Sequence, residues 1–244
     1  MKAFLLAAGL GTRLKPFTDH HPKALAPVHG RSLLEWNIRN LQRFCIFDIV
    51  VNVHHFADQI IDVLEREKGF GSRVQVSDES DAVLETGGGL KKAMPFFEGA
   101  GTLLVMNVDI LSNFDLDRML EQHRQSGAAV TLAVQQRETS RYFLFDETRQ
   151  LRGWENIKTG ERRIPGDFQV ADLGPYAFSG IQLMEESFLP GIRQEGKFSL
   201  VDVYLDRCVT QKIIAWDHTG DALLDVGKPE SLERAATLFP DTIQ

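Results

Sequence analysis

Short apolar runs that alternate with helix-period segments limit what this sequence can fold into more than any other feature. The runs cover residues 3–6, 49–51, 103–106, 130–134 and 222–224. Between them, apolar residues recur every three or four positions, which is the spacing of one helix face. This alternation predicts an α/β fold in which a mostly parallel, Rossmann-like sheet is flanked by helices in three layers.

The helical segments are identified by their apolar faces. Such faces occur in residues 34–45, 57–64, 116–123 and 232–239, and the last helix is expected to begin at Pro229, where the missing amide proton is no loss. A further helix is expected over residues 90–97, after a glycine triplet. Glycines and prolines scattered among charges in residues 140–175 predict an inserted hairpin or a substrate lid.

Composition excludes several classes of protein. The chain has 244 residues and a net charge of −7, so it lacks the basic character of a nucleic-acid-binding protein. No apolar run approaches the roughly 18 residues of a membrane span, and the chain shows no signal segment. The two cysteines, Cys45 and Cys208, have neither disulfide nor metal-ligand spacing, which is typical of a reducing compartment. We therefore expect a cytoplasmic protein of one domain.

A glycine-rich loop follows the first apolar run. Gly9 and Gly11 allow main-chain amides to approach a phosphate or a base closely. Arg13, Lys15 and Lys23 bring three cations to the same short segment. The combination predicts a site for a polyphosphate.

Two better-known phosphate loops do not match. A dinucleotide fingerprint requires a third glycine where this chain has Leu14, and Pro16 discourages the helix that should follow. A Walker loop requires Gly-Lys-Ser/Thr after four intervening residues, and this segment has no such string.

The string GLGTRLKPFTDHHPK, residues 9–23, resembles the signature of the sugar-phosphate nucleotidyltransferases. The resemblance implies a nucleotide-diphospho-sugar transferase fold and transfer of a nucleotidyl group from a nucleoside triphosphate (NTP) to a sugar 1-phosphate. The string LETGGG, residues 84–89, is most similar to that of N-acetylmuramate 1-phosphate uridylyltransferases and favours UTP, with the sugar left open. Residues 1–110 would form the nucleotide-binding half, and residues 111–244 the sugar-binding half with the second metal aspartate.

Asp109 and Asp225 each follow an apolar run, at the strand ends where sites of open α/β sheets lie. Two carboxylates there suit one magnesium ion. By resemblance, both aspartates hold Mg²⁺, while Arg13 and Lys23 act on the phosphates.

The resemblance also implies the remaining site residues. The glycine triplet is expected to expose amides and leave room for a flat base. The residues expected to bind the nucleotide are Ala7, Ala8, Gly9, Gly11, Thr12, Glu85, Thr86, Gly87 and Asn107. For the sugar, Gly180 and Glu155 are expected, although Asn156-Ile157-Lys158 replaces the Glu-Lys-Pro that commonly follows such a glutamate.

Two other functions remain open at this point. A cytidylyltransferase for a non-sugar phosphate such as phosphocholine shares the amino-terminal loop. A nucleotide-sensing protein without catalysis would keep the pocket but has less reason to retain all four charged residues. A monomer and a homodimer are both compatible with the sequence.

Overall fold

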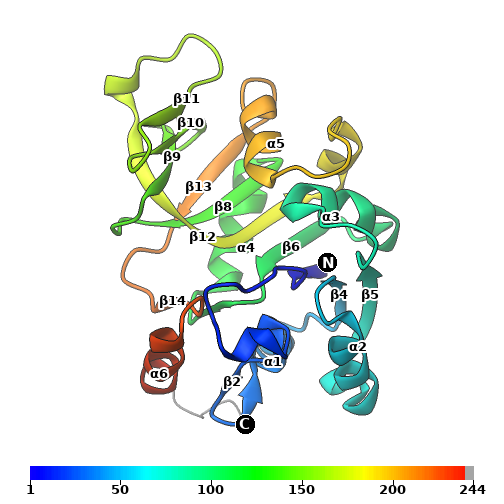
Figure 1. Ribbon diagram of the computed structural model, residues 1–244. Helices are drawn as coiled ribbons and strands as arrows, with labels where there is room; N and C mark the ends of the chain where they lie inside the picture. Colours follow the sequence, from blue (N-terminus) through cyan, green and yellow to red (C-terminus); the bar gives the residue numbers. More distant parts are fainter. Residues whose placement is uncertain (240–244) are drawn as a thin grey trace.

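The computed structural model describes residues 1–239, and it has a ten-stranded sheet at its centre (Figure 1). The strand order is β11-β10-β9-β12-β6-β1-β4-β5, and β8 pairs with both β12 and β13. Residues 240–244, the end of the predicted second half, lie outside the described part. The expected α/β fold with a mostly parallel sheet and flanking helices is confirmed.

The parallel part of the sheet carries the glycine-rich loop. It consists of β1 (Lys2–Leu6), β4 (Asp48–Val53), β5 (Arg73–Asp78) and β6 (Thr102–Asn107). All three pairings among them are parallel, so the carboxyl ends of these strands lie at one edge of the sheet. Buried side chains on both faces of β1, β4 and β6 explain why these three segments read as continuous apolar runs.

The remaining strands extend the sheet around one long strand, β12 (Gly174–Glu185), which is antiparallel to β6. β8 (Val130–Gln135) pairs with β12, and β13 (Ile213–Asp217) pairs with β8. β9 (Arg141–Phe145), β10 (Leu151–Asn156) and β11 (Glu161–Arg163) form an antiparallel meander. The hairpin expected in residues 140–175 is therefore present, and a lid function there stays a prediction.

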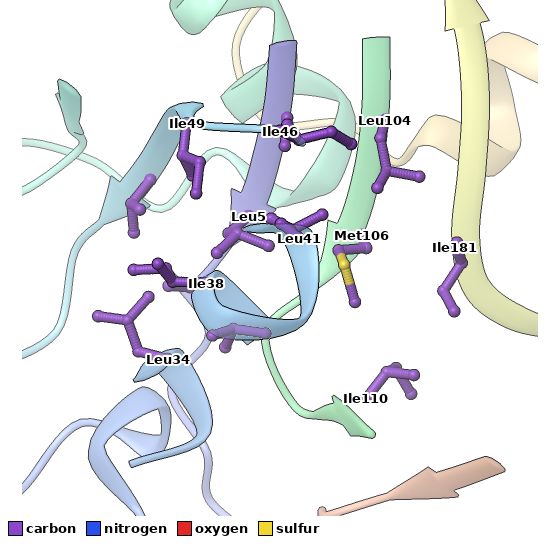
Figure 2. Packing of buried hydrophobic residues seen from close by; sticks show 14 of the residues in the cluster. Leu5, Leu34, Ile38, Leu41, Ile46, Ile49, Leu104, Met106, Ile110 and Ile181 are labelled. Carbon is purple, nitrogen blue, oxygen red and sulfur yellow. The ribbon is translucent and has the colours of Figure 1, made fainter. Parts of the chain in front are cut away.

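Helices cover both faces of the sheet (Figure 1). They are α1 (Leu33–Arg43), α2 (Ala57–Arg66), α3 (Glu85–Ala93), α4 (Leu116–Ser126), α5 (Leu200–Arg207) and α6 (Pro229–Leu238). Leu5 of β1 belongs to an apolar cluster with α1, α2 and α4. The preceding residue, Phe4, belongs to a second cluster with α3 and α5 on the opposite face of the sheet. Figure 2 shows the first of these clusters, in which Leu34, Ile38 and Leu41 of α1 face the sheet.

Two small ribbons complete the molecule. β7 (Ile110–Ser112) pairs with β14 (Leu223–Asp225), and β2 (Pro27–Val28) pairs with β3 (Arg31–Ser32). The last predicted strand thus exists but lies outside the main sheet. A third apolar cluster packs α6 and these ribbons against the other side of α1.

Short 3-10 segments lie between several of these elements. Their bounds are Phe17–Asp19, Lys23–Leu25, Lys68–Gly71, Met94–Phe97, Val170–Asp172 and Glu186–Gly191. Across residues 1–239, no helix has both the length and the apolarity required to cross a membrane.

Candidate active site

A cavity of about 550 Å³ opens where β1 and β6 end, at the edge predicted from the strand pattern. The predicted site residues that line it are Ala7, Ala8, Gly9, Gly11, Thr12, Arg13, Lys23, Glu85, Thr86, Asn107 and Asp109. Asp225 lines a smaller hollow next to it, which shares Arg13 and Gly227 with the main cavity. Most of the predicted residues therefore gather in one place.

Gly11 is the position in the loop that requires glycine. Its φ is +61°, a conformation that side-chain-bearing residues rarely adopt. A Cβ here would also lie 2.9 Å from Thr18 Cγ2 and 3.0 Å from Lys23 Cβ. The carbonyl of Gly11 accepts hydrogen bonds from the amide of Leu14 and the hydroxyl of Thr18, at 2.9 Å each. The loop is thus closed tightly against the segment that carries Lys23.

The start of the loop is held by Asn52, a buried side chain at the end of β4. Its Oδ1 accepts hydrogen bonds from the amides of Ala7 (2.6 Å) and Ala8 (3.3 Å), and its Nδ2 donates to Glu79 Oε1 (2.7 Å). These two amides are therefore hydrogen-bonded within the protein. Asn52 was not predicted from the sequence, although a polar residue inside the apolar run of β4 is a signal that could have found it.

Four charged side chains converge at the mouth of the cavity. The ammonium group of Lys23 forms a close ion pair with Asp109 and lies 3.7 Å from Asp225 Oδ1. The guanidinium of Arg13 lies 3.8 Å from Asp225 Oδ2. Lys23 is nearly buried, whereas Arg13 and Asp225 are exposed to the solvent. Both aspartates face the same ammonium group, as a shared cation site requires.

The two aspartates meet because of a ribbon that joins distant parts of the chain. Asp109 immediately precedes β7, and Asp225 ends β14, the antiparallel partner of β7. The amide of Val226 donates a 2.9 Å hydrogen bond to the carbonyl of Asp109. Gly227 leaves room beside them, since a Cβ there would lie 2.8 Å from Asp225 Oδ1 and 2.9 Å from Arg13 Nη2.

The electrostatics of this cluster suit a divalent cation. Burial raises the pKa of Asp109, and the neighbouring Asp225 carboxylate raises it further, while the ammonium of Lys23 opposes both effects. Within residues 1–239, no group of three or more acidic, histidine or cysteine side chains could hold a metal. Mg²⁺ fits two carboxylates nonetheless, because it commonly takes its other ligands from water and substrate phosphates.

The glycine triplet lies inside a helix and not, as was expected, before one, and the role of Gly87 toward a nucleotide stays a prediction. α3 begins at Glu85, so Gly87, Gly88 and Gly89 lie inside a helix rather than before one. The amides of Gly87 and Gly88 donate to the carbonyl of Phe198, at 2.9 and 3.2 Å. A Cβ on Gly87 would overlap the Phe198 ring, and one on Gly89 would lie 2.6 Å from Glu79 Oε1. The triplet makes room for protein packing, and Glu85 and Thr86 are the residues of this segment that reach the cavity.

Gly180 lies at a bulge in β12, beside the cavity. The pairing of β12 with β8 jumps from Phe178–Val134 to Gln182–Leu132, which leaves the intervening residues unpaired with β8. Gly180 has a φ of +74°, and a Cβ there would lie 3.0 Å from Asn107 Nδ2. The bulge therefore brings the main chain of β12 against a residue that lines the cavity. The role of Gly180 toward a sugar stays a prediction.

Glu155 is placed apart from the other predicted residues. It lies on β10, in the meander, and does not line the main cavity. Its carboxylate accepts hydrogen bonds from Nε (3.0 Å) and Nη2 (2.8 Å) of Arg162. A sugar that bound to Glu155 would compete with this ion pair.

Two further residues of the cavity wall were missed in the sequence. Lys197 and Ser199 precede α5, and the Lys197 ammonium lies 3.4 Å from Glu85 Oε1. No sequence pattern connects this segment to the cavity, because the connection depends on the packing of α5 against α3.

Residues 3–166 match the MobA-like NTP transferase domain. The chain belongs to this family. The nucleotidyltransferase is 30% identical over 232 residues to an N-acetylmuramate alpha-1-phosphate uridylyltransferase from Caulobacter vibrioides, across 90% of this chain and 91% of the relative. It is 38% identical over 115 residues to the Neisseria meningitidis protein of that name, across 47% and 49% of the two chains. The predicted resemblance to sugar-phosphate nucleotidyltransferases is confirmed.

The fold of this nucleotidyltransferase is also found in solved structures. A Bacillus anthracis protein assigned as a glucose-1-phosphate thymidylyltransferase superposes with a TM-score of 0.81, across 99% of this chain and 96% of that protein. The sequence identity is 19%, so this likeness establishes the fold alone.

Proposed function

We propose that this nucleotidyltransferase uses Mg²⁺ to transfer a uridylyl group from UTP to N-acetylmuramate 1-phosphate, which gives a UDP-sugar and pyrophosphate. The observation that carries the proposed chemistry is the cluster of Lys23, Arg13, Asp109 and Asp225 at the mouth of the cavity. Nearly full-length similarity to the Caulobacter vibrioides enzyme supports the choice of base and sugar.

The main obstacle to this reaction is repulsion between two anions. The acceptor phosphate carries close to −2 at pH 7, by analogy with a phosphorylated side chain. At about 4 Å and an effective dielectric near 20, each pair of like unit charges costs roughly 4 kcal/mol. The acceptor is already ionised, so no general base is needed, and catalysis consists of alignment and charge neutralisation.

The residues of the cluster divide this task. Arg13 is exposed and has a fork of donors that suits the paired oxygens of the leaving pyrophosphate. Lys23 is nearly buried between the aspartates, where its ammonium can neutralise the α-phosphate and the attacking phosphate. Asp109 and Asp225 would hold Mg²⁺, which when bound supplies a Lewis acid for the oxygens of both reactants.

The proposal is tested by measuring pyrophosphate release with each of the four NTPs and a panel of phosphorylated acceptors. We expect turnover with UTP and N-acetylmuramate 1-phosphate, its loss on chelation with EDTA, and its return with added Mg²⁺. Turnover only with CTP and phosphocholine would replace the proposal with the cytidylyltransferase alternative. Tight NTP binding without pyrophosphate release from any acceptor would indicate a nucleotide sensor instead.

A further inference from the structure

We propose that Arg137 recognises the carboxylate of the acceptor sugar and so selects an acidic sugar 1-phosphate over a neutral one. This inference rests on the proposed function, because N-acetylmuramate differs from N-acetylglucosamine by a lactyl ether that carries a carboxylate. Arg137 follows β8 in the chain, and neither the sequence signature nor the cluster of four charged residues includes it.

The position of Arg137 is fixed by a contact with β12. Its Nη2 donates a 2.9 Å hydrogen bond to the carbonyl of Phe178, the residue at which regular pairing with β8 breaks off. Two residues later, Gly180 lies against Asn107 of the cavity wall. The guanidinium is therefore anchored at the bulge whose Gly180 lies against Asn107, a residue of the cavity wall.

Arg137 is influenced by the charge of Asp225 but forms no ion pair within residues 1–239. Burial lowers the pKa of Arg137, and the charge of Asp225 and the hydroxyl of Tyr142 act in the opposite direction. Its positive charge also acts on His218. Among the residues that the structure describes, however, no carboxylate lies within 4 Å of this guanidinium, unlike Arg13, Arg149 and Arg152.

An exposed guanidinium without a carboxylate partner can bind an anion from a ligand. It presents five N–H donors, and the Phe178 carbonyl takes one of them. A carboxylate matches the remaining fork in geometry and charge. The sugar phosphate is the other anion that could use it, but Lys23 and Arg13 already serve the phosphates. A role on the phosphate would affect every acceptor equally, so the two roles are distinguishable.

The test compares two acceptors that differ only in the lactyl carboxylate, N-acetylmuramate 1-phosphate and N-acetylglucosamine 1-phosphate. For the wild type, Arg137→Gln and Arg137→Lys, kcat/KM is measured for both acceptors, and binding of each is measured by calorimetry without NTP. Arg66→Gln is the matched control, because this exposed arginine ends α2, at the opposite edge of the sheet. Thermal unfolding shows whether each variant remains folded.

We expect Arg137→Gln to lower kcat/KM and affinity for the acidic acceptor about 10- to 100-fold, the size of one charge-assisted hydrogen bond, and to leave the neutral acceptor nearly unchanged. Arg137→Lys should recover part of the loss, and Arg66→Gln should cause none. An equal loss for both acceptors, or an undiminished preference in Arg137→Gln, would overturn the inference. If UTP is not the donor, the binding measurements still decide the role of Arg137, so failure of the proposed function is seen separately.

Discussion

Replacement of Gly11 by alanine should impair both folding and catalysis, and the two effects can be separated. The new methyl group would force a side-chain-bearing residue to a φ of +61°, at a cost of roughly 1–2 kcal/mol. It would also meet Thr18 Cγ2 at 2.9 Å and Lys23 Cβ at 3.0 Å, and overpacking of this kind costs about 1–3 kcal/mol. Together, these effects predict a loss of about 2–5 kcal/mol in the free energy of unfolding.

Gly127 provides a matched control for the free-energy cost of a positive φ. Its φ is +62°, and nothing lies within 4 Å of the position that its Cβ would take. Gly127→Ala should therefore lose only about 1–2 kcal/mol, with turnover unchanged. In Gly11→Ala, the methyl group displaces the Lys23 segment, and misplacement of a catalytic group by a few tenths of an ångström should lower kcat about tenfold.

The assay is urea unfolding of both variants, followed by steady-state pyrophosphate release at saturating substrate. We expect a larger loss of stability in Gly11→Ala than in Gly127→Ala, together with a loss of kcat in Gly11→Ala alone. Equal stability losses and wild-type kcat in both variants would show that the contact with Lys23 does not constrain the loop.

Three further predictions concern other groups. Burial raises the pKa of Glu79 above its ordinary value near 4.5, so the stability that the protonated carboxyl group contributes is lost as the pH rises through the raised pKa. Glu79→Gln should therefore unfold at a higher urea concentration than the wild type at pH 7. This advantage should be gone below pH 4.5. The hydroxyl of Tyr204 is buried without a partner in the described chain, and Tyr204→Phe should add about 1 kcal/mol to the free energy of unfolding, measured by the same titration. Lys23→Ala and Asp225→Asn should each reduce kcat on the order of 10²- to 10³-fold while circular dichroism stays unchanged, and near wild-type rates would remove the residue from the mechanism.

The sequence predicted which residues gather at the cavity better than it predicted the contacts that hold them there. Asp109 and Asp225 could be predicted because a carboxylate after an apolar run falls at a strand end, where sites of α/β sheets lie. The β7–β14 ribbon that joins them could not be predicted, because the local sequence of a three-residue strand does not indicate which strand it pairs with. The ion pair of Glu155 with Arg162 likewise depends on the register of β10 against β11.

The start of α3 at the glycine triplet also could not be predicted from local helix propensity. Glycine disfavours helix interiors by about 1 kcal/mol per residue relative to alanine, so local reasoning places the helix start after Gly89. In the structure, α3 includes all three glycines, and Phe198, Gly196 and Glu79 occupy the space that side chains at these positions would need. The close packing of α3 against the segment before α5 compensates for the propensity cost. That packing also brings Lys197 to the cavity, so the substitution that best improves the local helix, Gly87→Ala, would force apart one wall of the site.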